Sequence, residues 1–241
     1  MKHFYLGWDV GGWNCDKNPS SRDAIIILDQ AGTILGHSWR GNLTQVFNQA
    51  NSTHDCLRLL FDLCQVELPN EPFHVMMAID TPLGFSEALI NLITQRTVAG
   101  DIGPSQQNPY LYRETERYLF QHGLSPLSPV KDMIGSQATK GIHFLGKFAP
   151  YAKQIGIWTD GEKLSVFEGY PSASKRSVWM NTFYTSYEDQ LNDDKNDALW
   201  CALLAYCVEQ HAKQILFPYN NVSVNEGWIF VPSDVIKQST P

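Results

Sequence analysis

The chain has 241 residues, and 43% of them are hydrophobic, so it can bury the core of one large α/β domain or of two small ones. Its 18 basic and 25 acidic residues give a net charge of −7, which argues against a protein that coats nucleic acid, although a local basic groove is compatible with this sum. The five cysteines are odd in number and show no CxxC spacing, which argues against a disulfide framework and against a zinc site.

The segment before Asp9 is too short and becomes acidic too early for a signal peptide. No apolar run approaches the ~20 residues that a membrane-spanning helix requires. We therefore expect a soluble, cytoplasmic protein without a membrane partner.

The first third of the chain predicts three strands and then a helix. Residues 4–8 are apolar and aromatic and stop at Asp9, which precedes a glycine turn. Residues 23–28 form a β-branched run, and a short turn leads to a returning strand over 33–39. Residues 53–66 carry apolar side chains at helical spacing.

A fourth strand is predicted over 73–79, and it ends at Asp80. Ser86 is placed to cap the helix that follows, which extends to Ile93. Residues 98–112 are rich in Gly, Pro, Gln and Asn and predict a long loop.

The middle of the chain continues with a charged helix over 112–119. An irregular stretch over 124–130 follows, because Pro126 and Pro129 interrupt regular structure. A second helix is predicted over 136–155.

The last third returns to a strand and a helix. A fifth strand over 164–167 ends at Glu168, a strong helix spans 194–212, and a short terminal strand covers 227–232. This order predicts a single α/β domain over 1–241 with a mixed five-stranded sheet flanked by helices. A helical and loop insert over 98–160 separates strands four and five. We expect it to lie over the carboxyl ends of the parallel strands, where open α/β sheets bind ligands.

Acidic residues stand at the ends of these elements. Asp9, Asp80 and Glu168 each end a strand, whereas Asp194 and Asp197 lie in the first turn of the last helix. If the three strands are neighbours, their carboxylates converge on one edge of the sheet. Like charges at this distance raise each other's pKa, and a hard cation such as Mg²⁺ or Mn²⁺ removes that cost by accepting oxygen ligands.

Each acid also has a purely structural interpretation. Asp9 and Asp80 could be turn residues, Glu168 could pair with Lys175, and Asp194 is well placed as a helix N-cap. Asp197 is harder to explain in this way, because it lies on the apolar stripe of its helix and a carboxylate there needs a partner or a metal.

Five segments together resemble the signatures of a family of uncharacterised, predicted nucleases with a ribonuclease H-like fold. They are Gly7–Trp13, Ile79–Phe85, Phe167–Pro171, Asp194–Leu199 and Gly227–Pro232, and they occur in the expected order over essentially the whole chain. The resemblance implies a ribonuclease H-like sheet. It also implies that Asp9, Asp80, Glu168 and Asp197 are catalytic, with Asp194 as a near neighbour that joins Asp9, Asp80 and Asp197 as a metal ligand.

Four basic residues are candidates for binding a phosphate-bearing substrate: Arg113, Arg117, Lys131 and Lys140, all within the insert. Arg113 and Arg117 lie one helical turn apart, on one face. Arginine and lysine opposite carboxylates would suit a phosphate. The alternative is a solvated helix face with intrahelical ion pairs.

The leading functional hypothesis is phosphodiester hydrolysis that depends on Mg²⁺ or Mn²⁺, with a nucleic acid or a phosphorylated small molecule as partner. Asp9 and Asp80 would ligate one ion, and Asp197 or Glu168 would complete a second. One alternative is a nucleotide-binding phosphotransferase of the actin-like superfamily, in which the glycine turn after Asp9 forms the phosphate loop. Another is a ribonuclease H-like domain that binds without catalysis. The histidines, His74 among them, are scattered and are interpreted as ordinary surface or core residues.

Overall fold

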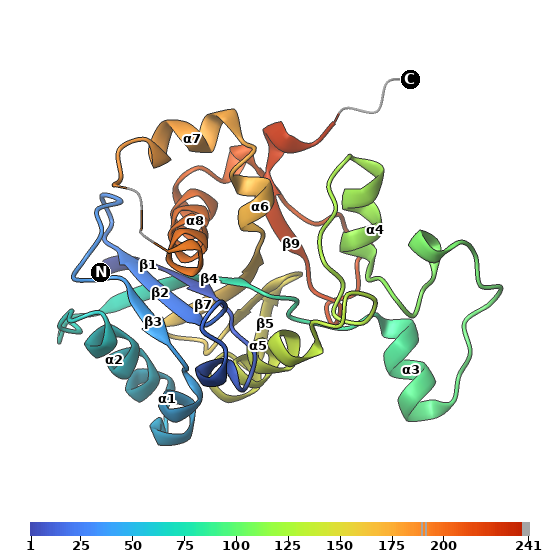
Figure 1. Cartoon of the computed structure of the whole chain (residues 1–241), viewed down its shortest axis with the longest axis horizontal. Coiled ribbons are helices and arrows are strands. Elements are labelled where there is room, and N and C mark those ends of the chain that lie inside the picture. Colours follow the sequence, from blue (N-terminus) through green and yellow to red (C-terminus); the bar gives the residue numbers. More distant parts are fainter. Residues whose placement is uncertain (189, 191, 238–241) are drawn as a thin grey trace.

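The computed structural model describes residues 1–188, 190 and 192–237. Its centre is a mixed β-sheet of nine strands with helices on both faces (Figure 1). The strand order is β3-β2-β1-β4-β7-β6-β5, and β9 pairs with β7 and with β8. The strands are β1 (Lys2–Asp9), β2 (Asp23–Leu28), β3 (Trp39–Gly41), β4 (Phe73–Asp80), β5 (Tyr151–Gln154), β6 (Ile157–Thr159), β7 (Leu164–Gly169), β8 (Ile215–Leu216) and β9 (Ile229–Pro232).

The helices form two layers and an outlying group. They are α1 (Thr44–Gln49), α2 (Thr53–Leu63), α3 (Glu87–Gln95), α4 (Glu114–Gln121), α5 (Gly135–Phe148), α6 (Pro171–Ser174), α7 (Val178–Tyr184) and α8 (Asp193–Gln210). Helices α1, α2 and α5 share a buried cluster with one face of the sheet, and α7 and α8 share a second cluster with the other face. Helices α3 and α4 lie beyond the edge of these layers (Figure 1). Short 3-10 turns cover Cys15–Lys17, Ser105–Gln107, Ala212–Gln214 and Ser233–Val235.

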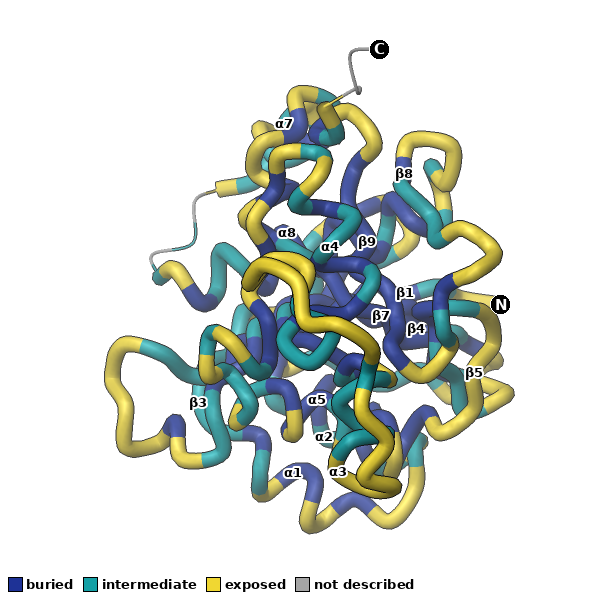
Figure 2. Tube along the Cα trace, turned by 90° about the vertical axis from the view of Figure 1, so that its right-hand side faces the viewer, coloured by how far each residue is buried: buried dark blue, intermediate teal, exposed yellow. Residues whose placement is uncertain are grey.

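Strand β1 shows why the sheet has two cores. Alternate residues of a strand point to opposite faces, so Phe4, Leu6 and Trp8 join the cluster under α1, α2 and α5, whereas Tyr5 joins the cluster under α8. Strands β1, β4 and β7 are buried along most of their length and form the centre of the molecule (Figure 2). Continuous apolar runs are typical of such parallel strands, which are covered on both faces.

Helix α8 lies along the central strands at close range. A Cβ atom at Gly7 would lie 1.9 Å from the carbonyl oxygen of Ala198, so a residue with a side chain cannot occupy this position without moving the helix. Small residues on the helix, Ala198 and Ala202, face the same contact. The glycine therefore fixes how closely the first half of α8 approaches β1.

The register of the central strands determines which side chains lie next to each other. Strands β1 and β4 are parallel, and Asp9 is the partner of Asp80 at one end while His3 is the partner of His74 at the other. Strands β4 and β7 are also parallel, with Ile79 paired with Glu168. The register of the backbone thus places the acids at the ends of these strands on one edge of the sheet, as the sequence predicted.

The α/β class and the mixed, helix-flanked sheet are confirmed, but the number of strands was wrong. The sheet gains β5, β6 and β8, and the terminal strand β9 pairs with β7 rather than standing outside it. The strand expected over 33–39 is reduced to Trp39–Gly41, with Ile34 contributing only an isolated bridge to Leu28.

The helix expected over 136–155 ends at Phe148. Pro150 follows, and a residue that precedes proline is disfavoured in the α conformation. The chain then forms the β5–β6 hairpin, which turns at Gly156 with a φ of 77°. The last part of segment 98–160 therefore belongs to the sheet.

Within the described residues, no helix is long and apolar enough to cross a membrane.

Candidate functional site

Three aspartates converge at the carboxyl ends of β1 and β4. Asp9, Asp80 and Asp197 each offer a carboxylate oxygen, and these three oxygens lie within 4.8 Å of one another. Asp9 and Asp80 end their strands side by side, and Asp197 lies in the second turn of α8. The structure thus brings together three of the four residues that the sequence proposed as catalytic.

The start of α8 is fixed by a cap one turn before Asp197. The side chain of Asn192 accepts hydrogen bonds from the backbone N–H groups of Asp194 and Lys195. Asn192 is therefore the N-cap, a role that the sequence interpretation had allowed for Asp194. This cap sets the phase of the helix and with it the direction of Asp197.

A cavity of about 400 Å³ opens beside the aspartates. Its lining comprises Asp9, Val10, Asp80, Thr81, Pro82, Ser125, Pro126, Leu127, Ile134, Gln137, Glu168, Gly169, Tyr170, Ser172 and Ile229. Residues 125–137 of the insert thus close one side of it. Thr81 is only 4% exposed, and its hydroxyl oxygen has no hydrogen-bond partner among the described residues. A buried hydroxyl without a partner costs free energy, so this group points to a ligand in the cavity.

The electrostatics of Asp9 and Asp80 are unfavourable for bare carboxylates. Among the described residues, neither side chain accepts a hydrogen bond or forms an ion pair with a basic residue. Burial, together with Asp80 and Asp197, raises the pKa of Asp9 well above its usual value. Burial, together with Asp197 and Glu168, raises the pKa of Asp80 to about 8. Both groups would ionise far more readily beside a cation.

Asp197 has a direct ion-pair partner, whereas the same lysine, Lys175, acts on Asp80 only at longer range by lowering its pKa. Lys175, which follows α6, forms an ion pair with the Asp197 carboxylate. Burial raises the pKa of Asp197, and Lys175 opposes that effect. The sequence interpretation named Lys175 as a possible partner of Glu168, but the structure pairs it with Asp197. The lysine side chain is 42% exposed, so it can move away from the carboxylate at small cost.

Glu168 reaches the cavity with both oxygens already engaged. Its Oε1 accepts from Arg113 Nη2 at 2.7 Å, and its Oε2 accepts from Arg113 Nη1 at 2.7 Å and from the Leu83 N–H at 2.9 Å. Arg113 also binds Glu116 through Nε and Nη2. This buried group joins β7, α4 and the loop after β4, and it holds the wall of the cavity in place.

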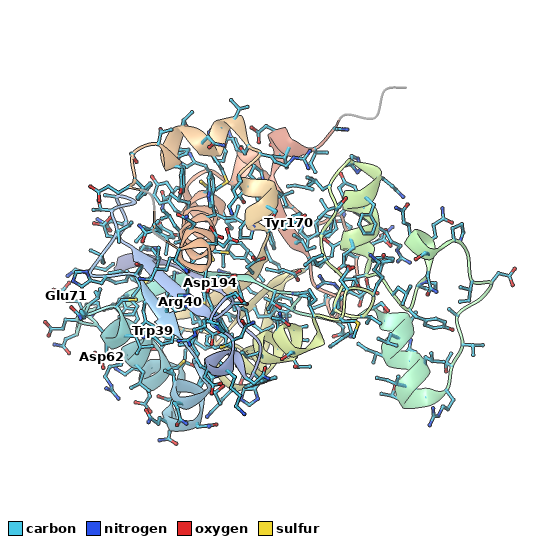
Figure 3. All side chains as sticks on the ribbon, viewed as in Figure 1. Trp39, Arg40, Asp62, Glu71, Tyr170 and Asp194 are labelled. Carbon is cyan, nitrogen blue, oxygen red and sulfur yellow. The ribbon has the colours of Figure 1, made fainter. Side chains whose placement is uncertain are left out.

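Asp194 lies apart from the three converging carboxylates. Its Oδ2 accepts from Arg40 Nε at 2.6 Å and from the Arg22 N–H at 3.0 Å. Figure 3 shows Arg40 and Asp194 side by side where β3 meets the start of α8, whereas Tyr170 lies near α6. Asp194 thus ties α8 to β2 and β3.

The four proposed phosphate-binding residues do not line the cavity. Arg113 is buried against Glu116 and Glu168, and Lys140 is buried with its ammonium group bound to Asp23. Arg117 pairs with Glu114, which matches the alternative of an intrahelical pair. Lys131 is about half exposed, pairs with Asp132, and borders a smaller hollow of about 270 Å³ that shares Ser125, Pro126 and Leu127 with the cavity.

The glycine turn after Asp9 is tied into the protein. The N–H of Gly11 donates to Asp23, and the N–H of Trp13 donates to Ser136. Lys140 donates to the carbonyl oxygens of Gly11 and Gly12. A loop that cradles phosphates needs outward-facing N–H groups, and two of those in this turn are already used.

Two residues of this region were missed as site residues by sequence reasoning. Thr81 follows Asp80 directly, so its position beside the cavity could have been inferred from the strand end. Lys175 lies seven residues after Glu168 in a polar stretch, and only the packing of α6 on α8 brings it to Asp197.

The three aspartates fit a hard divalent cation. Oxygens about 2.1 Å from one ion lie roughly 3.0–4.2 Å apart. The three carboxylate oxygens lie within 4.8 Å of one another, so small side-chain adjustments bring them to these distances. An all-oxygen donor set is typical of Mg²⁺ and Mn²⁺. Since both oxygens of Glu168 are engaged, the residues support one such ion more directly than the pair of ions expected from the sequence.

Comparison of the chain with protein families, with curated proteins and with solved structures gives no match. The resemblance to ribonuclease H-like predicted nucleases therefore stays a prediction.

Proposed function

We propose that this protein is a phosphodiester hydrolase of the nuclease type that depends on Mg²⁺ or Mn²⁺. The observation that carries the proposal is the meeting of Asp9, Asp80 and Asp197 beside a cavity, with Asp9 and Asp80 lacking any basic partner among the described residues. Three carboxylates held this closely are costly without a cation. The buried hydroxyl of Thr81 supports the same conclusion, because it is a further oxygen in the cavity wall without a partner.

The residues of this chain divide into three roles under this proposal. Asp9, Asp80 and Asp197 would hold the cation, which supplies charge neutralisation of the phosphate and an acidified water. Arg113 keeps Glu168 and the cavity wall in position through buried hydrogen bonds. Lys175 neutralises Asp197 when no cation is bound and is close enough to the site to meet a phosphate oxygen once it is released.

An extended substrate suits the shape of this surface. The cavity and the neighbouring hollow share Ser125, Pro126 and Leu127, so a chain that enters at the aspartates can continue toward Lys131. Lys131 is the one of the four proposed phosphate-binding residues that is placed to reach such a chain. This favours a nucleic acid over a small phosphorylated molecule.

We also propose the ribonuclease H-like fold and a cytoplasmic setting. The antiparallel β1–β2–β3 unit followed by parallel β4 and β7, with acids at the carboxyl edge, supports the first. The five cysteines, all buried thiols without disulfides, are typical of proteins from a reducing compartment and support the second.

The test is cleavage of labelled single-stranded DNA, double-stranded DNA, RNA and an RNA–DNA hybrid by the purified chain, with Mg²⁺, with Mn²⁺ and with a chelator. We expect cleavage of at least one substrate that requires the cation and is abolished by Asp9→Asn. Asp62→Asn is the matched control, since the Asp62 side chain is 56% exposed and, within the described part of the chain, pairs with Arg58 alone.

A folded Asp9→Asn protein that cuts as fast as the parent would contradict the proposal. The proposal would also be contradicted if neither Mg²⁺ nor Mn²⁺ binds the parent chain, as measured by calorimetry. Tight binding of ATP without cleavage would instead favour the phosphotransferase alternative.

A further inference from the structure

A second group of metal-ligating side chains lies at the opposite end of the same three elements. His3 is on β1, His74 is its register partner on β4, and Glu209 lies in the last turn of α8. One donor atom from each lies within 4.8 Å of the other two. The group is partly buried, with side-chain exposures of 31%, 14% and 23%.

Both imidazoles turn the same ring nitrogen toward the carboxylate. His3 Nδ1 lies 3.0 Å from Glu209 Oε2 and 3.1 Å from Oε1, and His74 Nδ1 lies 4.0 Å from Oε1. Donors around a tetrahedral Zn²⁺ at 2.0–2.1 Å are about 3.3 Å apart. The separations from Glu209 lie on either side of that value, and the two imidazole nitrogens lie within 4.8 Å of each other, so the three donors are close enough to share one ion after modest side-chain movement.

Hydrogen bonds behind these side chains orient them. His74 Nε2 lies 3.1 Å from the hydroxyl of Ser165, which leaves Nδ1 free to face Glu209. Tyr5 donates its hydroxyl to Glu209 Oε2 at 2.6 Å and accepts from Gln210 at 2.7 Å. Histidine ligands of metals are almost always held by a hydrogen bond from their other ring nitrogen, and ligating carboxylates are held similarly.

We propose that His3, His74 and Glu209 form a binding site for Zn²⁺ or a similar borderline transition-metal ion, distinct from the acidic cluster. Two imidazole nitrogens and one carboxylate oxygen are a donor set that suits zinc, with one position left open for water. The same set is a poor one for Mg²⁺, which takes oxygen ligands. The site does not depend on the proposed hydrolase function, because it shares no ligand with it.

The competing interpretation is a structural ion pair in which a protonated His3 binds Glu209. The charged groups around His74 besides Glu209 include Lys153, His3 and Asp160. An ion pair needs only His3 and Glu209, so in this case His74 would not respond to added metal. The metal site needs both imidazoles, so the behaviour of His74 separates the two.

The first experiment uses the unaltered chain, stripped of metal and kept in excess Mg²⁺ near neutral pH. Zn²⁺ is added during NMR of the histidine side-chain nitrogens, and Co²⁺ is added in parallel as a coloured substitute. We expect the Nδ1 signals of His3 and His74 to shift together at one equivalent of Zn²⁺, while His37 does not shift. We expect Co²⁺ to give the strong visible absorption of a four- or five-coordinate site with nitrogen ligands, rather than the weak absorption of an all-oxygen site.

Variants then assign the ligands. Tyr5→Phe leaves all three ligands in place but removes the hydrogen bond to Glu209 and the one from Gln210, and we expect it to weaken Zn²⁺ binding by roughly 10- to 100-fold. His74→Ala and Glu209→Gln remove ligands and should weaken binding more than Tyr5→Phe does. His37→Ala is the matched control, because His37 is exposed and is not one of the three grouped donors. Circular dichroism of each variant separates lost binding from lost folding.

The proposal is overturned if His74 does not respond to Zn²⁺ in the unaltered chain. It is also overturned if folded His74→Ala binds Zn²⁺ as tightly as the parent. Neither result affects the proposed hydrolase, whose test depends on Asp9 and on Mg²⁺ or Mn²⁺.

Discussion

The two ends of the unit formed by β1, β4 and α8 use the same scaffold for different chemistry. Each end collects one side chain from each element: Asp9, Asp80 and Asp197 at one, His3, His74 and Glu209 at the other. Six residue steps along a strand, from His3 to Asp9 on β1 and from His74 to Asp80 on β4, span about 20 Å. Twelve residue steps along the helix, from Asp197 to Glu209 on α8, span about 18 Å, which is nearly the same length. Because α8 lies along β1 and β4, these similar lengths bring a residue of the helix beside the strand residues at both ends.

What differs between the ends is how the charge is compensated. At the histidine end, Glu209 is held by Tyr5 and by the ring of His3, so its polar atoms have partners. At the aspartate end, Asp197 alone among the three forms an ion pair with a described residue, Lys175, while Asp9 and Asp80 face a cavity. Acidic side chains that face a cavity without hydrogen-bond partners, as Asp9 and Asp80 do among the described residues, are therefore the stronger sign of a function. The histidine end is stable without a bound ligand, because Glu209 already has hydrogen-bond partners.

The largest effect is expected from Asp80→Asn. It removes a central oxygen ligand, and since even changes behind a ligand cost roughly 10- to 100-fold, we expect cation-dependent cleavage to fall by more than about 100-fold. The same change removes an acid whose pKa the folded protein raises to about 8, so the melting temperature of the metal-free protein at pH 8 should rise. Cleavage assays and thermal melts, with Asp62→Asn as control, check both. A variant that loses activity and stability together would contradict this account of the aspartate end.

The second prediction concerns the buried arginine that supports the cavity wall. Arg113→Met leaves Glu116 and Glu168 buried without their counter-charge, so we expect a loss of about 3–5 kcal/mol in the free energy of unfolding. Arg117→Met breaks only the partly exposed pair with Glu114 and should cost at most about 1 kcal/mol. Urea denaturation measures both. If both variants lose the same free energy of unfolding, the cavity wall does not depend on the buried ion pairs of Arg113.

The third prediction uses pH to separate the two ends. The folded protein raises the pKa of Asp80 from 3.8 to about 8, so unfolding releases a proton between these values and the stability of the metal-free chain falls as pH rises from about 4 to about 8. Burial lowers the pKa of His74 below 6.5, so its contribution has the opposite sign and increases as pH rises through that value.

Thermal melts in chelator from pH 5 to pH 8 check this. Asp80→Asn should reduce the fall with pH, and the raised pKa of Asp9 accounts for the part of the fall that remains. Saturating Mn²⁺ should flatten it as well, because a bound cation keeps the aspartates ionised. A parent protein whose stability does not fall over this range would contradict the raised pKa of Asp80.

The smallest effect is expected from Lys175→Met. The lysine competes with a cation for Asp197, and a partly exposed ion pair is worth at most about 1 kcal/mol, so Mn²⁺ should bind up to about fivefold more tightly. Calorimetry measures the affinity, and Lys163→Met, which breaks the exposed pair with Glu162, is the control. Weaker binding of Mn²⁺ would show that Lys175 positions Asp197 rather than competing for it.

Much of the aspartate end could be predicted because its residues stand at the ends of strong local patterns. An apolar run that stops at Asp9, and another that stops at Asp80, place both acids at strand ends without any knowledge of the partner strand. Asp197 was found because it interrupts an apolar helical stripe. The basic residues could not be assigned in this way, since nothing local distinguishes the buried Arg113 and Lys140 from surface cations.

The histidine end illustrates what local patterns miss. His3 and His74 begin their strands and are more than seventy residues apart in the chain, and Glu209 lies in a helix end where a glutamate is unremarkable in sequence. The β5–β6 hairpin was missed for a related reason. Its first strand, Tyr151–Gln154, is exposed and carries no alternating apolar pattern, and it forms because β6 offers hydrogen-bonding partners.

The sequence by itself determined the α/β class, the strand and helix that carry each aspartate, and the exclusion of a disulfide framework. These are consequences of hydrophobic periodicity and of turn residues, which act over a few neighbouring positions. Only the tertiary structure decided the ion pairs, in which Arg113 binds Glu168, Lys140 binds Asp23 and Lys175 binds Asp197. Pairing of charges depends on distances across the fold and on burial, and strand register alone brought Asp9 beside Asp80 and His3 beside His74.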